Sequence, residues 1–250
     1  MDIKSREGNN MIRDFLKDEK YFDEFLRYEN ERIEKFNTAI NTVINQRGTE
    51  DEGVQRTYIS ISGFYFNKLR AMYSYGCSLE EIKALLPEAI DVMEKSWKPE
   101  SGYVQMVWML SIGIMLDMND DQFEKLNNLV KGHSVQDFLI NFLINSRNKT
   151  EWKVVDVKLL HEVPYAKLIE VIKCEDKDLS VIRLKEYLRL EWYEGHNDTG
   201  WYESHKNKND IYCGYWSFES GAIAKILQLD DRILKGIPYY PYDMVHYQVN

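Results

Sequence analysis

Residues 78–93 read SLEEIKALLPEAIDVM and indicate the fold class most clearly. Apolar residues recur there at steps of three and four, which places them along one face of an α-helix: Leu79, Ile82, Leu85, Leu86, Ile90 and Met93. Ser78 and Glu81 have the spacing of a capping box, in which a hydroxyl and a carboxylate satisfy backbone donors at the start of a helix. The stretch therefore predicts an amphipathic helix that begins at Ser78, with Pro87 as the position where it can kink.

The same spacing continues through most of the 250 residues. The first predicted helix opens with the apolar pattern of Met11, Ile12, Phe15 and Leu16 and ends at Gly48. The others are expected over about 54–75, 103–116, 119–132, 134–143, 164–174, 178–193 and 215–229, with start signals at Asn119 or Asp120, Ser134, Pro164, and Asp178 or Ser180. Only 5 Pro and 13 Gly occur, which also favours helices. We expect an all-α fold of nine to ten helices in an irregular bundle, with at most a short β element near 152–160.

The charge balance is acidic. The 41 acidic and 32 basic residues give a net charge of −9, which argues against a general nucleic-acid binder. Residues 1–130 carry 23 acidic and 16 basic side chains, whereas 131–250 carry 18 and 16, so the excess lies in the N-terminal half. An acidic protein of this kind fits a basic partner.

The sequence predicts a cytoplasmic protein. The first ten residues lack the apolar stretch of a signal peptide. The longest uncharged run, 101–116, is shorter than the ~20 residues that cross a bilayer and is expected to be a buried helix. Three widely spaced cysteines, Cys77, Cys174 and Cys213, do not form a disulfide pattern.

Two sequence patterns could indicate a catalytic site or a metal site. Glu151 with Lys153, and Asp156 with Lys158, match the acid-x-lysine core of restriction-like nucleases, but the sequence before them predicts helices and not the mixed sheet that such sites need. His196, His205 and Cys213 are close in sequence, but their spacing matches no compact zinc motif. We expect no catalytic residue, metal or cofactor, and keep a nuclease using Glu151 and Lys153 as an alternative.

Aromatic residues crowd one short span of the C-terminal third: Trp192, Tyr193, Trp201, Tyr202, Tyr212, Tyr215, Trp216 and Phe218. Aromatic side chains with a polar end pack in cores and are enriched at interfaces. The first interpretation is a core that locks the last helix, and the second is a surface that faces a partner.

The C-terminal motifs resemble those of the PoNi family, the immunity proteins of polymorphic nuclease toxins. The resemblance lies in YCGYWSFE at 212–219 and PYYPYD at 238–243, with an N-terminal counterpart of more general pattern. It covers about 130–247 and about 8–120, which we expect to form one compact unit. The motif residues expected to be structural are Trp201, Tyr202, His205, Gly214, Tyr215, Trp216, Phe218, Pro238, Tyr239, Tyr240 and Pro241.

The resemblance implies an all-helical cytoplasmic protein that binds and neutralises a secreted DNase toxin of the restriction-like superfamily. It implies no catalysis, no direct nucleic-acid contact and no membrane contact; a helical scaffold or adaptor is the remaining alternative. The acidic candidates for the toxin contact are Glu50, Asp51 and Glu52; Asp117, Asp120 and Asp121; Glu191, Glu194, Asp198 and Glu203; and Glu219. For the first two groups a solvated loop and a helix start are competing explanations, and Glu219 is either buried or partner-facing.

Overall fold

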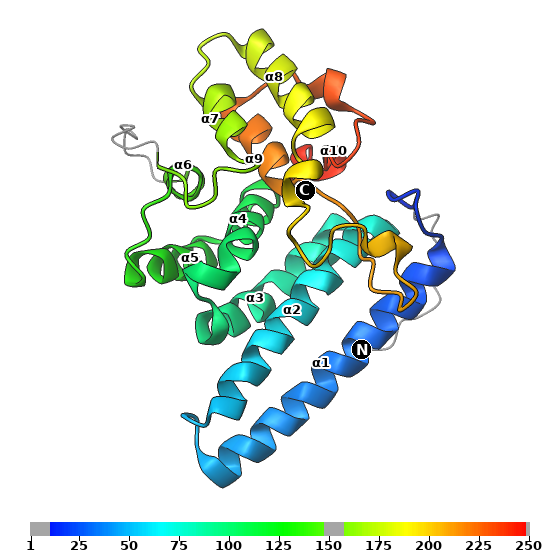
Figure 1. Cartoon of the computed structure of the whole chain (residues 1–250), viewed down its shortest axis with the longest axis vertical. Coiled ribbons are helices and arrows are strands. Elements are labelled where there is room, and N and C mark those ends of the chain that lie inside the picture. The colour runs from blue at the N-terminus through cyan, green and yellow to red at the C-terminus, as the bar shows by residue number, and fades with distance from the viewer. Residues whose placement is uncertain (1–10, 148–157, 249–250) are drawn as a thin grey trace.

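The structure is a computed structural model that describes residues 11–147 and 158–248 (Figure 1). Within these ranges the chain forms ten α-helices, three short 3₁₀ helices and no strand. The elements are α1 (Glu19–Arg47), α2 (Glu52–Tyr75), α3 (Leu79–Ser96), α4 (Pro99–Met115), α5 (Asp120–Gly132), α6 (Phe138–Asn145), α7 (Ala166–Ile172), α8 (Lys177–Leu190), η1 (Glu194–His196), η2 (Ser204–Lys206), α9 (Phe218–Leu227), η3 (Asp231–Leu234) and α10 (Tyr242–Val245). The expected all-α fold is confirmed for the described residues. Residues 152–157 of the expected β element lie outside them, and 158–160 form no strand.

Short polar side chains begin many of the helices. Asp18, Asp51, Ser78 and Asn119 each accept a hydrogen bond from a backbone N–H in the first turn of the helix that follows. The capping box of Ser78 with Glu81 is confirmed, and α3 continues unbroken through its proline. Of these caps, the sequence predicted Ser78 and Asn119 correctly, because each needs only a side chain and a backbone N–H within one turn.

The predicted helix starts at Ser134 and at Asp178 or Ser180 are wrong. The structure begins α6 after Asp137 and α8 after Asp176. Both aspartates accept hydrogen bonds from backbone N–H groups of the following turn, at 2.9 Å to 3.1 Å. Each helix therefore begins after a different N-cap residue from the one predicted. In both cases a short polar side chain still accepts hydrogen bonds from the first turn.

Other predicted boundaries also shift, and the helix expected from 103 begins at Pro99. The first helix begins at Glu19, so the apolar residues of 11–16 precede it instead of forming its first turns. Pro164 lies ahead of α7 and not within its first turn. The last long helix, α9, begins at Phe218, and the preceding residues 215–217 form no regular secondary structure.

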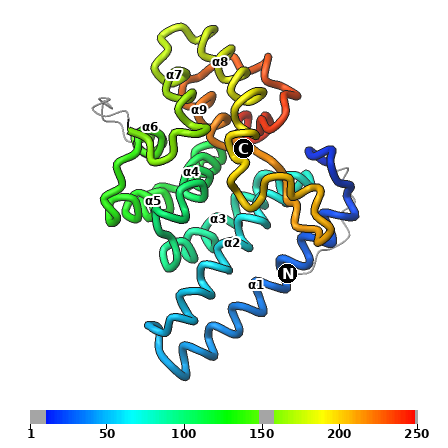
Figure 2. Tube along the Cα trace, viewed as in Figure 1, coloured from blue at the N-terminus to red at the C-terminus, as the bar shows by residue number. Residues whose placement is uncertain are grey.

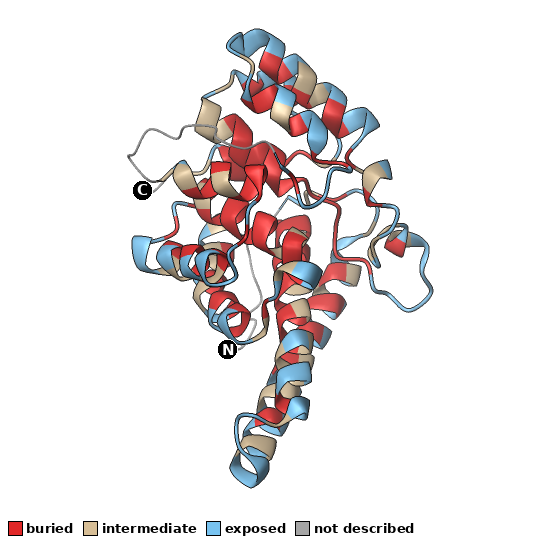
Figure 3. Ribbon diagram, turned by 60° about the vertical axis from the view of Figure 1, so that its left-hand side comes forward, coloured by how far each residue is buried: buried red, intermediate tan, exposed pale blue. Residues whose placement is uncertain are grey.

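Helices α1 and α2 form an antiparallel arm that projects from the body of the molecule (Figure 1). Toward the far end of this arm, most residues are exposed or only partly buried (Figure 3). The turn between the two helices is shorter than the loop expected over 49–53, because Asp51 already caps α2. The acidic residues of this turn therefore lie at the tip of the arm.

The body of the molecule is built around α4. Residues 106–113 of this helix are buried on every side, and it contacts α5, α6, α9 and α10. The uncharged run 101–116 is thus a buried helix, as expected. No helix among the described residues is long and apolar enough to span a membrane.

Residues 207–217, which we call the strap, run across the upper ends of α1 and α2 (Figure 2). Tyr21 of α1 donates a hydrogen bond to the carbonyl of Tyr212 at 2.8 Å. Ser74 of α2 donates to the carbonyl of Cys213 at 3.2 Å and accepts one from Trp216 Nε1 at 2.8 Å. The strap therefore ties the C-terminal part of the chain to its N-terminal arm.

Candidate functional site

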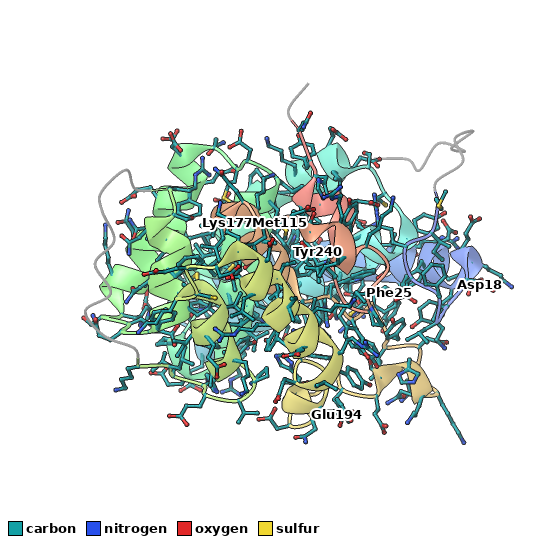
Figure 4. The ribbon with its side chains drawn as sticks, turned by 90° about the horizontal axis from the view of Figure 1, so that it is seen from above. Asp18, Phe25, Met115, Lys177, Glu194 and Tyr240 are labelled. Atoms are coloured by element: carbon teal, nitrogen blue, oxygen red, sulfur yellow. The ribbon has the colours of Figure 1, made fainter. Side chains whose placement is uncertain are left out.

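A partly exposed group of tyrosines and carboxylates follows α8. We call it the tyrosine–acid face and define it as Tyr193, Tyr202, Tyr239, Glu191, Glu194, Asp198 and Glu203. The ring of Tyr193 stacks on that of Tyr239 with centroids 5.3 Å apart and planes 11° apart, and it lies 4.6 Å from that of Tyr202. Figure 4 labels Glu194, which lies at the outer edge of the molecule in that view.

The carboxylates of this face point to solvent, whereas its rings are half-buried. Tyr202 donates a hydrogen bond of 3.0 Å to Glu194, and this bond raises the pKa of the phenol. Glu203 pairs with Lys206. In the described part of the chain no ion pair engages Glu191, Glu194 or Asp198. Three carboxylates therefore lack a cation, and Glu194 among them accepts only the hydrogen bond of Tyr202 within the described residues.

Buried rings support the face from below. His196 donates from Nδ1 to the carbonyl of Trp192 at 2.6 Å and accepts at Nε2 from the hydroxyl of Tyr165 at 3.0 Å. Burial lowers the pKa of His196 to about 4, so the imidazole is neutral. With both ring nitrogens engaged, this histidine holds the loop that carries η1 in place.

The zinc alternative finds no support in this geometry. The Nδ1 atom of His205 lies 2.8 Å from the hydroxyl of Tyr215, and Cys213 is buried in the strap. Burial raises the pKa of that thiol to about 11, which keeps it protonated. Across residues 11–147 and 158–248, no three His, Cys, Asp or Glu side chains are grouped to hold a metal ion.

Glu219 was a candidate contact residue, and the structure corrects this. Its side chain is 0% exposed, because α9 lies beneath the aromatic cluster. Its Oε1 atom accepts hydrogen bonds from Trp192 at 2.7 Å and Ser217 at 2.7 Å, and from Tyr187 at 3.3 Å. Burial raises the pKa of this carboxyl to about 7. Glu219 thus joins three elements inside the core and is inaccessible to a partner.

The acidic cluster at the tip of the arm is largely engaged in local contacts. Asp51 caps α2 and lies 3.8 Å from Arg47, and Glu52 pairs with Arg56 at 2.6 Å. Glu50 is exposed beside them. Neighbouring arginines on the same two helices therefore offset much of this charge.

The second acidic cluster surrounds one arginine. Arg147 lies 2.9 Å from Asp120 and 3.8 Å from Asp117, and Asp121 occupies the first turn of α5. The competing explanation of these aspartates as helix-start residues agrees with this geometry. Of the three exposed clusters, the tyrosine–acid face keeps the most carboxylates without a cation.

The family-motif residues mostly lie inside the molecule. Tyr215, Trp216, Phe218, Tyr240 and Pro241 are buried, whereas Trp201, Tyr202, His205 and Tyr239 are partly exposed and Pro238 is exposed. Gly214 has φ 106°, and a Cβ there would lie 2.0 Å from Ser74 Oγ. The motif thus lies partly in the strap and partly in the tyrosine–acid face, to which Tyr202 and Tyr239 belong.

The nuclease alternative rests on residues outside the described ranges. Glu151, Lys153 and Asp156 fall within 148–157, and Lys158 is exposed. No strand is present in the described residues to carry a restriction-like site.

The fold resembles that in "The Crystal Structure of Protein PA2201 from Pseudomonas aeruginosa". The TM-score is 0.70 at 16% sequence identity, over 96% of this chain and 91% of that chain. At this identity the likeness shows a shared fold. No curated protein sequence matches the chain.

Family models identify the class of protein. The model described as "PoNe immunity protein (PoNi), N-terminal" matches residues 13–128, and that described as "PoNe immunity proteins (PoNi), C-terminal" matches 135–244. This class comprises immunity proteins of polymorphic nuclease toxins, which are inhibitors and not enzymes. The chain belongs to the PoNi family, so the resemblance noted in its sequence is confirmed.

Proposed function

We propose that this chain neutralises a cognate DNase toxin by direct contact through the tyrosine–acid face. The observation that carries the proposal is the set of three exposed carboxylates without ion pairs, Glu191, Glu194 and Asp198, beside half-buried tyrosine rings. Tyrosine is enriched at protein interfaces because one ring supplies apolar area and a hydroxyl.

The partner's chemistry supports the same surface. A DNase must present cationic side chains to the DNA phosphates, so its DNA-binding groove is basic. An acidic face steers the encounter with such a groove and supplies charge pairs once bound. Occupying that groove, or covering its entrance, would keep DNA out. The proposal places this activity in the cytoplasm, where the toxin would reach chromosomal DNA.

Co-expression with a candidate cognate nuclease toxin tests the function itself. We expect cells that produce the nuclease to survive only when this chain is present, and DNA cleavage by the purified toxin to fall as the chain is titrated in. Death of the cells despite soluble immunity protein would refute the proposal.

Charge reversal tests the surface. Replacing Glu191→Lys and Asp198→Lys together changes the net charge by as much as Glu50→Lys with Glu52→Lys at the arm tip. We expect the first pair to weaken binding of catalytically inactive toxin at least tenfold, more than the roughly fivefold of one exposed ion pair. The tip pair serves as the matched control, and equal effects from both would point to long-range charge alone.

A further inference from the structure

The rings of the tyrosine–acid face form the outer end of a stacked column. Between ring centroids, Tyr239 lies 4.8 Å from the buried Trp192 and 5.3 Å from Tyr193, and Tyr193 lies 4.6 Å from Tyr202. Among the described residues, Tyr193 is the one ring that packs on Tyr202, which is partly exposed. Tyr202 therefore ends the column at the surface, with part of its ring open to solvent.

Elsewhere on the surface of this protein, tyrosine rings carry cations of the same chain. A cation over the face of an aromatic ring is attracted by the negative charge density of that face. Five partly or fully exposed tyrosines have such a cation, at these distances from the ring centroid: Lys17 on Tyr21 at 4.9 Å, Arg32 on Tyr28 at 5.2 Å, Lys95 on Tyr58 at 5.0 Å, Lys235 on Tyr242 at 5.4 Å and Lys83 on Tyr247 at 5.5 Å.

The three rings of the tyrosine–acid face differ from these five. In the part of the chain that the structure describes, no lysine or arginine lies over Tyr193, Tyr202 or Tyr239. Exposed ring surface at this face therefore lacks the internal cation that other tyrosines of the same protein have.

The carboxylates beside Tyr202 are in the same situation. Residues 187–206 carry four carboxylates against two basic side chains, Arg189 and Lys206, and Lys206 pairs with Glu203. Glu194 accepts the hydrogen bond of the Tyr202 hydroxyl at 3.0 Å, so its charge lies at the edge of that ring. A cation held over the ring would also be attracted by this carboxylate, and the two attractions add.

Tyr202 is already held in position by the loop around it. Its backbone N–H donates to the carbonyl of Thr199 at 3.2 Å, and the N–H of Glu203 donates to the hydroxyl of Tyr193 at 3.2 Å. The hydroxyl of Thr199 donates in turn to the carbonyl of His196 at 2.7 Å. An ordered ring loses little conformational entropy when a partner binds, which favours its use as an anchor of an interface.

We propose that the open face of Tyr202 binds a cationic side chain of the toxin, with Glu194 as the counter-ion. This inference rests on the proposed function and names the chemical group that the tyrosine–acid face selects. A nuclease presents lysine and arginine side chains to the DNA phosphates, so a partner of this class supplies such groups. The ring and the carboxylate would then complete the pairing that the chain itself leaves open at this place.

A fluorination series at one ring tests the contact. Tyr202→Phe keeps the ring and removes the hydroxyl, and phenylalanines with one, two or three fluorines at position 202 weaken the attraction for a cation stepwise while changing the shape little. Binding of catalytically inactive toxin is measured by calorimetry, with the melting temperature as the folding control. We expect affinity to fall with each fluorine, by about tenfold from Tyr202→Phe to the trifluorinated ring.

The same series at Tyr28 is the matched control. Tyr28 is 56% exposed on the arm and already carries Arg32, so its fluorinated variants should bind toxin within about twofold of Tyr28→Phe. Tyr202→Phe itself should bind within about fivefold of the unsubstituted protein, because it loses one hydrogen bond and keeps the ring face. A loss of binding beyond measurement in Tyr202→Phe would make the hydroxyl the contact and overturn the inference.

The remaining outcomes separate this inference from the proposed function. Equal affinity along the series at Tyr202, or equal slopes at Tyr202 and Tyr28, would overturn the cation site; the proposed function would stand if Glu191→Lys with Asp198→Lys still weakens binding. No binding by the unsubstituted protein would remove both. A dimer in light scattering that dissociates along the Tyr202 series would assign the cation to a second copy of this chain and would also overturn the inference.

Discussion

The indole Nε1 of Trp192 donates a hydrogen bond of 2.7 Å to Oε1 of Glu219, and both side chains are fully buried. This bond joins the segment after α8 to the first turn of α9. The second carboxyl oxygen of Glu219 has no hydrogen-bond partner among the described residues. Burial with one oxygen unsatisfied favours the protonated form of a carboxyl group, which makes stability depend on pH.

Stability should depend on pH through Glu219. Its folded pKa, about 7, lies above the ordinary value of 4.5, so the folded state binds the extra proton between these values. The stabilising contribution is fully present below about pH 4.5 and is lost as pH rises through about 7. Between pH 5 and pH 8 the unsubstituted protein should lose up to about 3 kcal/mol of unfolding free energy through this group. Glu219→Gln cannot ionise, so its unfolding free energy should not show this loss.

Urea unfolding at the two pH values measures this difference, and the exposed Glu191→Gln is the control that should show no such change. Parallel pH profiles for Glu219→Gln and the unsubstituted protein would contradict the expectation.

The ring of His196 should stay neutral well below the pH at which a free histidine ionises. Its pKa of about 4 follows from burial, although the hydrogen bond to the Trp192 carbonyl opposes the shift. Because the folded pKa is depressed below 6.5, the stability linked to this group is present above pH 6.5 and is lost as pH falls through about 4. NMR of ¹³C-labelled imidazole rings gives the midpoint, with His196→Gln to assign the resonance. Titration near pH 6.5 would show that the ring is hydrated.

Gly214→Ala should destabilise the fold more than an alanine at another glycine of positive φ that has free space around it. The φ of Gly214 is 106° and its added Cβ would meet Ser74 Oγ at 2.0 Å. Gly236 has φ 77° but nothing within 4 Å of its Cβ position. We expect Gly236→Ala to cost about 1 kcal/mol of unfolding free energy and Gly214→Ala about 2–4 kcal/mol, because overpacking adds to backbone strain. Equal costs in denaturant titrations would mean that the strap adjusts freely.

Ser74→Ala should loosen the strap by leaving a buried donor unpaired. The hydroxyl accepts from Trp216 Nε1 at 2.8 Å and donates to the carbonyl of Cys213 at 3.2 Å. Losing both bonds costs about 1–3 kcal/mol of unfolding free energy. Ser111→Ala is the matched control, since within the described residues that buried hydroxyl bonds the carbonyl of Val107 in its own helix and no other group. A loss no larger than in the control would show that the strap does not depend on Ser74.

Local pattern predicted the helices well and failed where distant contacts compete. The capping box at Ser78 needs only residues three apart, so sequence spacing sufficed. The apolar run of 11–16 looked like the first turns of α1, but hydrogen bonds from Arg13 to the end of α2 and from Tyr212 to Asp14 hold it out of the helix. Those partners are 60 or more residues away and leave no local trace.

The candidate site was only partly visible in the sequence. Three acidic clusters were candidates for the contact, and within the described residues ion pairs engage two of the three carboxylates in each of the first two but only Glu203 in the third. The pair of Glu52 with Arg56 follows from helical spacing and could have been foreseen. That of Asp120 with Arg147 joins residues 27 apart and could not. Burial of Glu219 likewise depends on how α9 packs under the aromatic rings.

By itself, the sequence determined the helical class, the caps of α3 and α5, the acidity and, through its tyrosine-rich motifs, the family. These properties depend on residue type and on spacings within a few turns. The tertiary structure alone decided that Asp120 pairs with Arg147 and that Glu219 is buried. Both depend on which distant side chains come together when the chain packs, because these contacts join segments that are far apart in the sequence.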